Sequence, residues 1–211
     1  MSKRKRKRES AALFERLTEI AAQSWSDNPS VQPMETSNEL RLMKKFRFQL
    51  LHRWMTTHLA PCKVADIGGG KGLLTYLLQQ SGWQSQVIDP VSQELPTKYK
   101  DIVSGRQIKI STDETVSRID QPFDPKMVDK FDLLVGVHAH GCNMQIIDSV
   151  TKTGRQFILM PCCIIDEPVC PSPNTHWLEC VLRYALEKGA QVKPFQLNFR
   201  GQNIGFYGRM Q

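Results

Sequence analysis

The sequence predicts an α/β protein with a doubly wound, mostly parallel sheet. Short apolar runs alternate with helix-like segments between residues 63 and 188, which is typical of parallel strands joined by crossover helices. Two further extended runs, 192–199 and 203–210, flank Arg200-Gly201-Gln202 and predict a terminal hairpin, which adds one antiparallel strand. We therefore expect a domain over 61–211 in which strands alternate with helices, preceded by a helical extension over 10–60.

The positive charge of the chain is concentrated at its start. The 211 residues carry a formal net charge of +7, and Lys3 to Arg8 supply six of these positive charges. The rest has 22 basic and 21 acidic residues and is nearly neutral. A block of like charges repels itself, so we expect residues 1–9 to form a disordered basic tail. It would contact nucleic-acid phosphates, act as a nuclear localisation signal, or remain solvated without a specific partner.

Two helices are expected in the extension over residues 10–60. The first covers Glu9 to Trp25, with Ser10 as a candidate N-cap, and ends before Asn28-Pro29. The second begins near Ser37 and ends before Pro61. Its apolar stripe comprises Leu40, Met43, Phe46, Leu50, Leu51 and Trp54. Stripes at this spacing usually pack on a core, and we favour that interpretation over a cap that grips cofactor or substrate.

The elements of the domain over 61–211 follow in regular order. The expected strands before the hairpin are 63–67, 84–89, 105–110, 131–137 and 157–160. The expected helices are 71–80, 143–150 and 175–188. With the hairpin, this gives seven strands.

A glycine-rich turn joins the first expected strand to its helix. Asp66 is the penultimate residue of the expected strand, and Gly68, Gly69, Gly70 and Gly72 follow after Ile67. Glycines allow positive φ angles and a close approach of the backbone to a ligand. The first amides of the following helix are unpaired and attract an anion. The stretch therefore predicts a binding site for a ligand with an anionic group.

The order of the glycines separates three types of loop. A phosphate-binding P-loop needs a hydroxyl residue after its lysine, but Gly72 follows Lys71. A dinucleotide fingerprint would need glycine where Leu73 stands. The pattern Asp-x-Gly-x-Gly-x-Gly instead resembles motif I of the class I S-adenosylmethionine-dependent methyltransferases. This resemblance implies a Rossmann-like methyltransferase fold with seven strands, and S-adenosylmethionine held at Asp66, Gly68, Gly69, Gly70 and Gly72.

Two more acids extend the expected cofactor site. Asp89 lies at the end of the second expected strand, 23 residues after Asp66, where an acid can accept hydrogen bonds from both ribose hydroxyls. Asp113 follows the third expected strand, where the resemblance places the adenine.

Histidines and cysteines follow the fourth and fifth expected strands. His138-Ala139-His140-Gly141 and Cys162-Cys163 resemble a methyltransferase subgroup that includes a class of tRNA ribose methyltransferases and methyltransferase-like proteins of unclear substrate. His140 stands where that subgroup commonly has cysteine. The resemblance implies that His138 lies beside the methionine portion of the cofactor. His138 and His140 are our catalytic candidates as general bases; a cysteine nucleophile, or histidines that only pack, are the alternatives.

No metal ligand is assigned from the sequence. The zinc-compatible residues are His138, His140, Cys142, Cys162, Cys163, Cys170 and His176, but no Cys-x2-Cys pair occurs among them. Adjacent cysteines in a chain of this length indicate free thiols in reducing cytosol or nucleus rather than a disulfide framework.

These observations predict an intracellular S-adenosylmethionine-dependent methyltransferase, either cytoplasmic or nuclear. No secretory signal pattern and no apolar run near the ~20 residues of a membrane helix is present. An RNA acceptor is preferred because of the subgroup resemblance and the basic tail. A protein acceptor, or an inactive methyltransferase-like scaffold that binds RNA, are the alternatives, and the oligomeric state is left open.

Overall fold

The structure is a computed structural model that describes residues 3–22, 24 and 44–210, with the side chains of the first helix described from Glu9 onward. The proposed N-cap Ser37 and the stripe residues Leu40 and Met43 lie outside the described residues. No helix among the described residues is both long and apolar enough to span a membrane.

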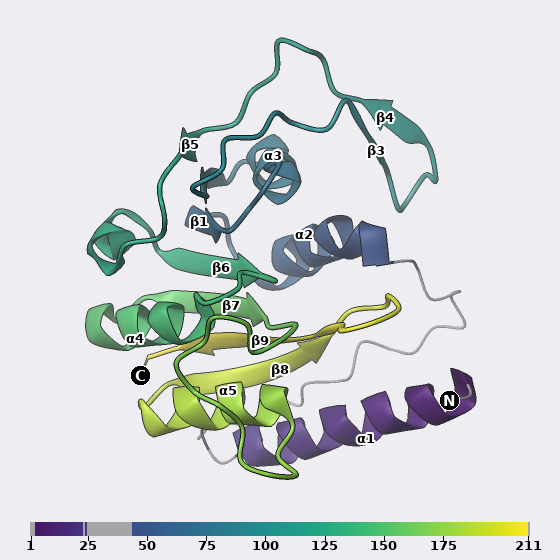
Figure 1. The fold of residues 1–211 in the computed structure, drawn as a ribbon. Helices are drawn as coiled ribbons and strands as arrows, with labels where there is room; N and C mark the ends of the chain where they lie inside the picture. The colour runs from purple at the N-terminus through teal and green to yellow at the C-terminus, as the bar shows by residue number, and fades with distance from the viewer. Residues whose placement is uncertain (1–2, 23, 25–43, 211) are drawn as a thin grey trace.

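A seven-stranded sheet forms the centre of the molecule (Figure 1). Its strands are β1 (Lys63–Ile67), β2 (Gln84–Ile88), β5 (Arg118–Ile119), β6 (Leu133–Val137), β7 (Gln156–Met160), β8 (Gln191–Gln196) and β9 (Ile204–Arg209). Their order is β5-β2-β1-β6-β7-β9-β8. Neighbours from β5 to β7 are parallel, and β9 is antiparallel to both β7 and β8. The predicted doubly wound sheet with one antiparallel strand is confirmed.

The third expected strand was placed wrongly. Gln107–Lys109 is β4, which pairs with β3 (Lys98–Lys100) in a separate two-stranded sheet. The third strand of the main sheet is instead β5, which pairs with β2. Because β5 has two residues only, it gives no periodic signal in the sequence, whereas the alternating run around β4 does.

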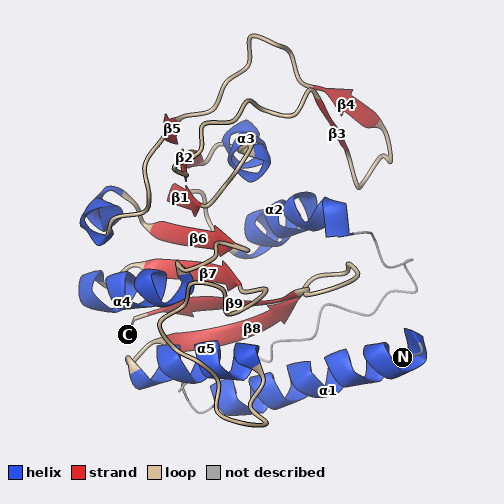
Figure 2. Cartoon of the chain, viewed as in Figure 1, coloured by secondary structure: helices blue, strands red, loops and turns tan. Residues whose placement is uncertain are grey.

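Helices cover both faces of the sheet (Figure 2). On one face lie α2 (Arg47–His58), preceded by the 3₁₀ helix η1 (Lys44–Phe46), and α3 (Leu73–Gln80). They share a hydrophobic core with those residues of β1, β6 and β7 that point to this face. The other face packs against α1 (Lys3–Ala22), η2 (Pro125–Lys130), α4 (Asn143–Thr153) and α5 (Trp177–Glu187). Alternate residues of a strand point to opposite faces, so Leu134 belongs to one core and Leu133 to the other.

The first helix differs from its prediction at the N-terminus. It begins at Lys3, so the basic run that was expected to be a disordered tail is drawn as its first turns. Ser10 lies inside the helix rather than at its cap, and its hydroxyl accepts a hydrogen bond from Gln196 of β8 at 3.1 Å. Leu17 and Ala21 are buried in the core beside α5. This part of the extension is therefore an integral layer of the molecule.

The β8 edge of the sheet lies beside α1. The amide of Val192 donates to the Ser24 hydroxyl at 3.3 Å, just beyond the end of α1. Pro194 stands two residues further along the same strand. The opposite edge is β5, with its two residues.

Candidate active site

The glycine turn after β1 has the left-handed backbone that its sequence predicts. Gly68, Gly70 and Gly72 have φ angles of 65°, 54° and 75°. A Cβ atom on Gly69 would lie 2.7 Å from the Asp66 carboxyl group, and one on Gly72 would lie 2.8 Å from a Val116 methyl carbon. A side chain larger than hydrogen is therefore excluded at Gly69 and Gly72.

The buried side chain of Asp66 packs against this turn at Gly69. It is 1% exposed, and its Oδ2 accepts a hydrogen bond from the Thr75 hydroxyl at 3.0 Å. Its Oδ1 has no hydrogen-bond partner among the described residues. Burial raises the pKa of Asp66 from 3.8 to about 6, against the opposing effect of the Thr75 hydrogen bond.

Asp89 joins the turn to the loop after β2. Its Oδ2 accepts the Gly70 amide and its Oδ1 accepts the Val91 amide, both at 2.9 Å. Each carboxylate oxygen has a second lone pair for a further donor. The predicted ribose acid is thus fixed against the glycine turn, at the carboxyl end of β2.

Arg118 is a site residue that the sequence analysis missed. From β5, its Nη1 donates to the Gly70 carbonyl at 2.8 Å and its Nη2 donates to the Val91 carbonyl at 3.1 Å. Its Nε donates to Asp120 Oδ1 at 3.1 Å. One guanidinium group therefore connects the loops that follow three neighbouring strands. No sequence signal marked it, because β5 itself was not recognised.

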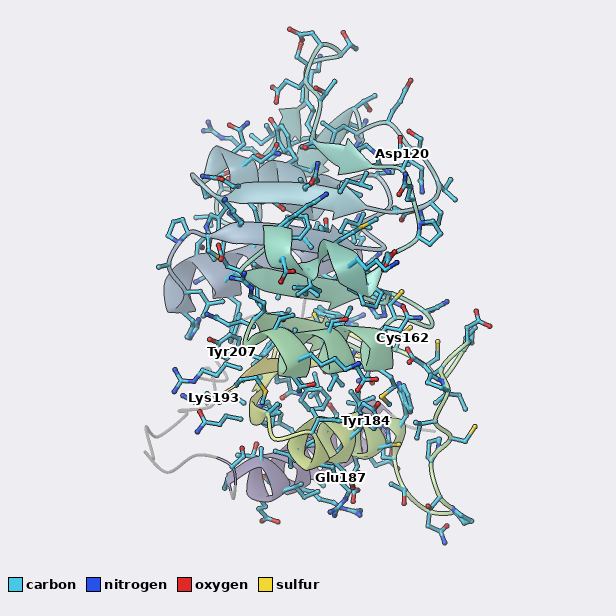
Figure 3. All side chains as sticks on the ribbon, turned by 90° about the vertical axis from the view of Figure 1, so that its left-hand side faces the viewer. Asp120, Cys162, Tyr184, Glu187, Lys193 and Tyr207 are labelled. Carbon is cyan, nitrogen blue, oxygen red and sulfur yellow. The ribbon has the colours of Figure 1, made fainter. Side chains whose placement is uncertain are left out.

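The acid that follows the third strand is Asp120, not Asp113. Asp113 lies in the connection between β4 and β5, where a hydrogen bond from Ser111 lowers its pKa. Asp120 comes directly after β5, and Figure 3 shows it on the same side of the molecule as Cys162, which follows β7. The prediction that Asp113 contacts the adenine assumed that Asp113 follows the third strand of the main sheet, and Asp120 holds that position.

His138 has an unusual environment at the end of β6. Its φ of 58° is left-handed, a conformation that is costly for a residue with a side chain and recurs at functional sites. Both ring nitrogens are buried and have no hydrogen-bond partner within the described part of the chain. Burial, followed by the charges of Lys44 and Arg47, lowers the pKa of His138 to about 4. The ring is therefore neutral at pH 7.

His140 lies beside the two adjacent cysteines. Its Nε2 is 3.2 Å from Cys162 Sγ and 3.3 Å from Cys163 Sγ. The expectation that the ends of these two strands are neighbours is correct, because β6 pairs with β7. The other predicted histidine and cysteine candidates are not part of this group: His176 caps α5 by accepting the Leu178 amide, and Cys142 precedes α4.

Two hollows flank the strand ends. One, which we call the basic cleft, has a volume of about 500 Å³. Its wall from η1 and α2 includes Lys45 and Phe46, and its wall from β3 includes Lys98, Tyr99 and Lys100. The other hollow, of about 670 Å³, lies between residues 92–97 and 110–118. Arg118 borders it, but the glycine turn does not line it.

Comparison with known proteins identifies the fold. Magnesium protoporphyrin IX methyltransferase from Synechocystis PCC 6803, solved with bound S-adenosylmethionine, superposes with a TM-score of 0.50 at 14% identity, over 79% of each chain. With the strand order above, this shows that the chain has the Rossmann-like fold of the class I S-adenosylmethionine-dependent methyltransferases.

A curated relative by sequence comes from Caenorhabditis elegans and carries the name "Probable tRNA (uracil-O(2)-)-methyltransferase". It is 32% identical over 111 residues, which are 49% of this chain but 17% of the relative. The chain thus spans about a sixth of that protein. No family model matches the chain.

Proposed function

We propose that this protein is an S-adenosylmethionine-dependent methyltransferase that acts on RNA. The observation that carries the enzyme class is the convergence of the glycine turn, Asp89 and Asp120 at the carboxyl ends of β1, β2 and β5, with the unpaired ring of His138 at the end of β6. Ligands of open α/β sheets bind at this edge.

The residues of the site fit the parts of this cofactor. The glycine turn excludes side chains and presents free helix amides to the methionine carboxylate. Asp89 has lone pairs left for the ribose hydroxyls, and Asp120 can accept from the adenine amino group. Bound there, the cofactor supplies an activated methyl group.

His138 is proposed to position the acceptor. Methyl transfer is an in-line displacement, and alignment of the acceptor atom is the main contribution of the protein. A neutral, buried and unpaired imidazole can accept a hydrogen bond from an acceptor hydroxyl. Its pKa of about 4 makes it a weak base, so we assign it orientation rather than full proton removal. His140, whose Nε2 faces two thiols, is not assigned this role.

The basic cleft supports RNA as the acceptor. It combines three lysines with the partly exposed ring of Tyr99, a composition that suits phosphates and a stacked base. The basic run at the start of α1 adds positive charge, and the C. elegans relative is named for a tRNA. Six free cysteines also fit an intracellular, reducing setting, in the cytoplasm or the nucleus.

The cofactor assignment is tested by calorimetric titration with S-adenosylmethionine, S-adenosylhomocysteine and NAD. We expect micromolar binding of the first two and none of NAD. Asp89→Ala removes the ribose acceptor and a contact to the glycine turn, and should weaken S-adenosylmethionine binding by about tenfold or more, the value of one charge-assisted hydrogen bond. Equal affinity of wild type and Asp89→Ala would refute the ribose assignment. Cofactor binding without methyl transfer to any cellular RNA would favour the scaffold alternative.

The RNA assignment is tested with a double variant of the basic cleft, Lys98→Glu with Lys100→Glu. Fluorescence anisotropy with labelled tRNA should show weaker binding, and the slope of log affinity against log salt should fall by about 1 to 2. Lys152→Glu, on α4 across the sheet, is the control and should change little. RNA affinity that is unchanged in the cleft variant, or absent in the wild type, would count against RNA and favour a protein acceptor.

A further inference from the structure

The cluster of His140, Cys162 and Cys163 takes no part in the proposed function. Besides the two contacts of His140 Nε2, the sulfur atoms of Cys162 and Cys163 are 3.3 Å apart. The three donor atoms all lie within 4.8 Å of one another. One nitrogen and two sulfurs are donors that zinc binds well.

The two loops that carry these donors are fixed to each other by the backbone. The His138 amide donates to the Met160 carbonyl at 3.2 Å, and the Gly141 amide donates to the Ile165 carbonyl at 3.1 Å. Glu167 then accepts the amides of Asn143 and Met144 at the start of α4. These contacts hold the donors together before any ligand binds, so little conformational entropy remains to be lost on binding.

We propose that His140, Cys162 and Cys163 bind one zinc ion through Nε2 and the two Sγ atoms. Zinc–sulfur and zinc–nitrogen bonds of about 2.3 and 2.0–2.1 Å place tetrahedral donors roughly 3.5–3.8 Å apart. The observed separations are a few tenths of an ångström shorter, so the three side chains need only open slightly. Both thiols release their protons on binding, and the two thiolates and the dication form a neutral unit.

The proposed site keeps one coordination position for an exogenous ligand. Three protein donors leave the fourth tetrahedral position open, an arrangement found in catalytic rather than structural zinc sites. His140 is exposed, so solvent reaches the cluster. The site also adjoins the cofactor edge, because Ala139 is 3.2 Å from the Cβ position of Gly68. Water or an oxygen atom of the acceptor would fill this position.

The distance between the two sulfur atoms also shows whether Cys162 and Cys163 form a disulfide bond instead. A disulfide bond requires about 2.05 Å, and the two sulfurs stand well beyond that distance as free thiols. Burial and the neighbouring Cys163 raise the pKa of the Cys162 thiol to about 11.

The test measures metal binding directly and does not depend on methyl transfer. The full chain, purified without chelators under anaerobic conditions, is loaded with zinc, dialysed and analysed by inductively coupled plasma mass spectrometry. Cobalt(II) is loaded in parallel, because sulfur ligation gives a near-ultraviolet charge-transfer band and tetrahedral geometry gives intense visible bands. We expect about one zinc per chain and both cobalt signatures.

Three variants make the test specific. Cys163→Ser and His140→Ala should weaken zinc binding by about a hundredfold in a competition with a chromogenic chelator, and should lose or change the charge-transfer band. Cys170→Ser, at an exposed cysteine outside the cluster, should match the wild type. Circular dichroism checks that each variant is folded. No metal in the wild type, equal losses in all three variants, or a Cys162–Cys163 disulfide under these conditions would overturn the proposal.

Discussion

At the scale of a single residue, Asp66 occupies a position beside the glycine turn that lowers the stability of the fold when its carboxyl group is ionised. A carboxyl group with one oxygen bound to Thr75 and the other without a described partner is costly to ionise when it is buried. It also lies 2.7 Å from where a Cβ on Gly69 would stand, so its side chain and the turn fit each other only with glycine. The sequence predicted the strand, the glycine turn and the helix at this point, because the order of Asp66 and the glycines along the chain is itself the signal.

The raised pKa of Asp66 predicts a pH-dependent stability. The folded chain holds the proton up to about pH 6, whereas the unfolded chain releases it near pH 3.8. Between these values the folded state binds more protons, so the free energy of unfolding should fall as the pH rises, by about 3 kcal/mol in total. The nearby charges of Asp89 and Arg118 modify this value in opposite directions.

Urea unfolding at pH 4, 5, 6 and 7, followed by tryptophan fluorescence, measures this dependence. Asp66→Asn cannot ionise and should show a flatter profile over the same range. Identical profiles for the two proteins would show that Asp66 does not titrate in this window.

Other residues of the site carried too little signal in the sequence. The left-handed backbone of His138 and its unpaired ring are features of the folded chain that no local sequence pattern encodes. Lys44 and Arg47 looked like ordinary charges of an amphipathic helix. Their effect on His138 arises only once the two distant segments meet.

At the scale of elements, the short strand β5 decides where we propose that the adenine end of the cofactor binds. A two-residue strand has no periodicity, and the more regular β4 took its place in the prediction. Strands β1, β2 and β6 to β9 and helices α3, α4 and α5 were predicted to within a few residues, because each has an apolar run of sufficient length and a turn residue at its end. Because β4 was taken for the third strand of the main sheet, Asp113 was expected at the carboxyl ends of the strands, whereas it lies in the connection between β4 and β5.

This reassignment predicts a difference between two aspartates. Asp120→Ala should lower the affinity for S-adenosylmethionine by about tenfold, since it removes an acceptor at the strand end and releases the Nε of Arg118. Asp113→Ala, in the connection before β5, should leave the affinity nearly unchanged. Isothermal titration calorimetry of both variants at the same salt concentration compares them. The opposite ranking would restore the original placement.

At the scale of the whole molecule, α1 is a structural layer rather than an appendage. Leu17 is fully buried, and Arg16 forms an ion pair of 2.7 Å with the buried Glu179 of α5. The choice of α5 and β8 as neighbours depends on the chain order of the entire sheet.

The packing of α1 predicts that one side chain far from the candidate active site, Leu17, has a large effect on the free energy of unfolding. Leu17→Ala should lower the free energy of unfolding by about 3 kcal/mol, the usual cost of a cavity in a core. Glu19→Ala, at an exposed position of the same helix, should change it by less than about 0.5 kcal/mol. Chemical denaturation of the two variants measures both values. A loss below about 1 kcal/mol for Leu17→Ala would mean that α1 contributes little to the folded state.

The two edge strands of the seven-stranded sheet also affect whether protein molecules associate at high concentration. Strand addition by a second chain needs a row of outward amides and carbonyls. On β8, Val192 already donates to Ser24, and Pro194 has no amide hydrogen to offer. On the other side, β5 presents two residues, too few to hold a new strand in register. The edges of the seven-stranded sheet therefore give little template for edge-to-edge growth, and amyloid-like association through this sheet should be weak even in a concentrated solution.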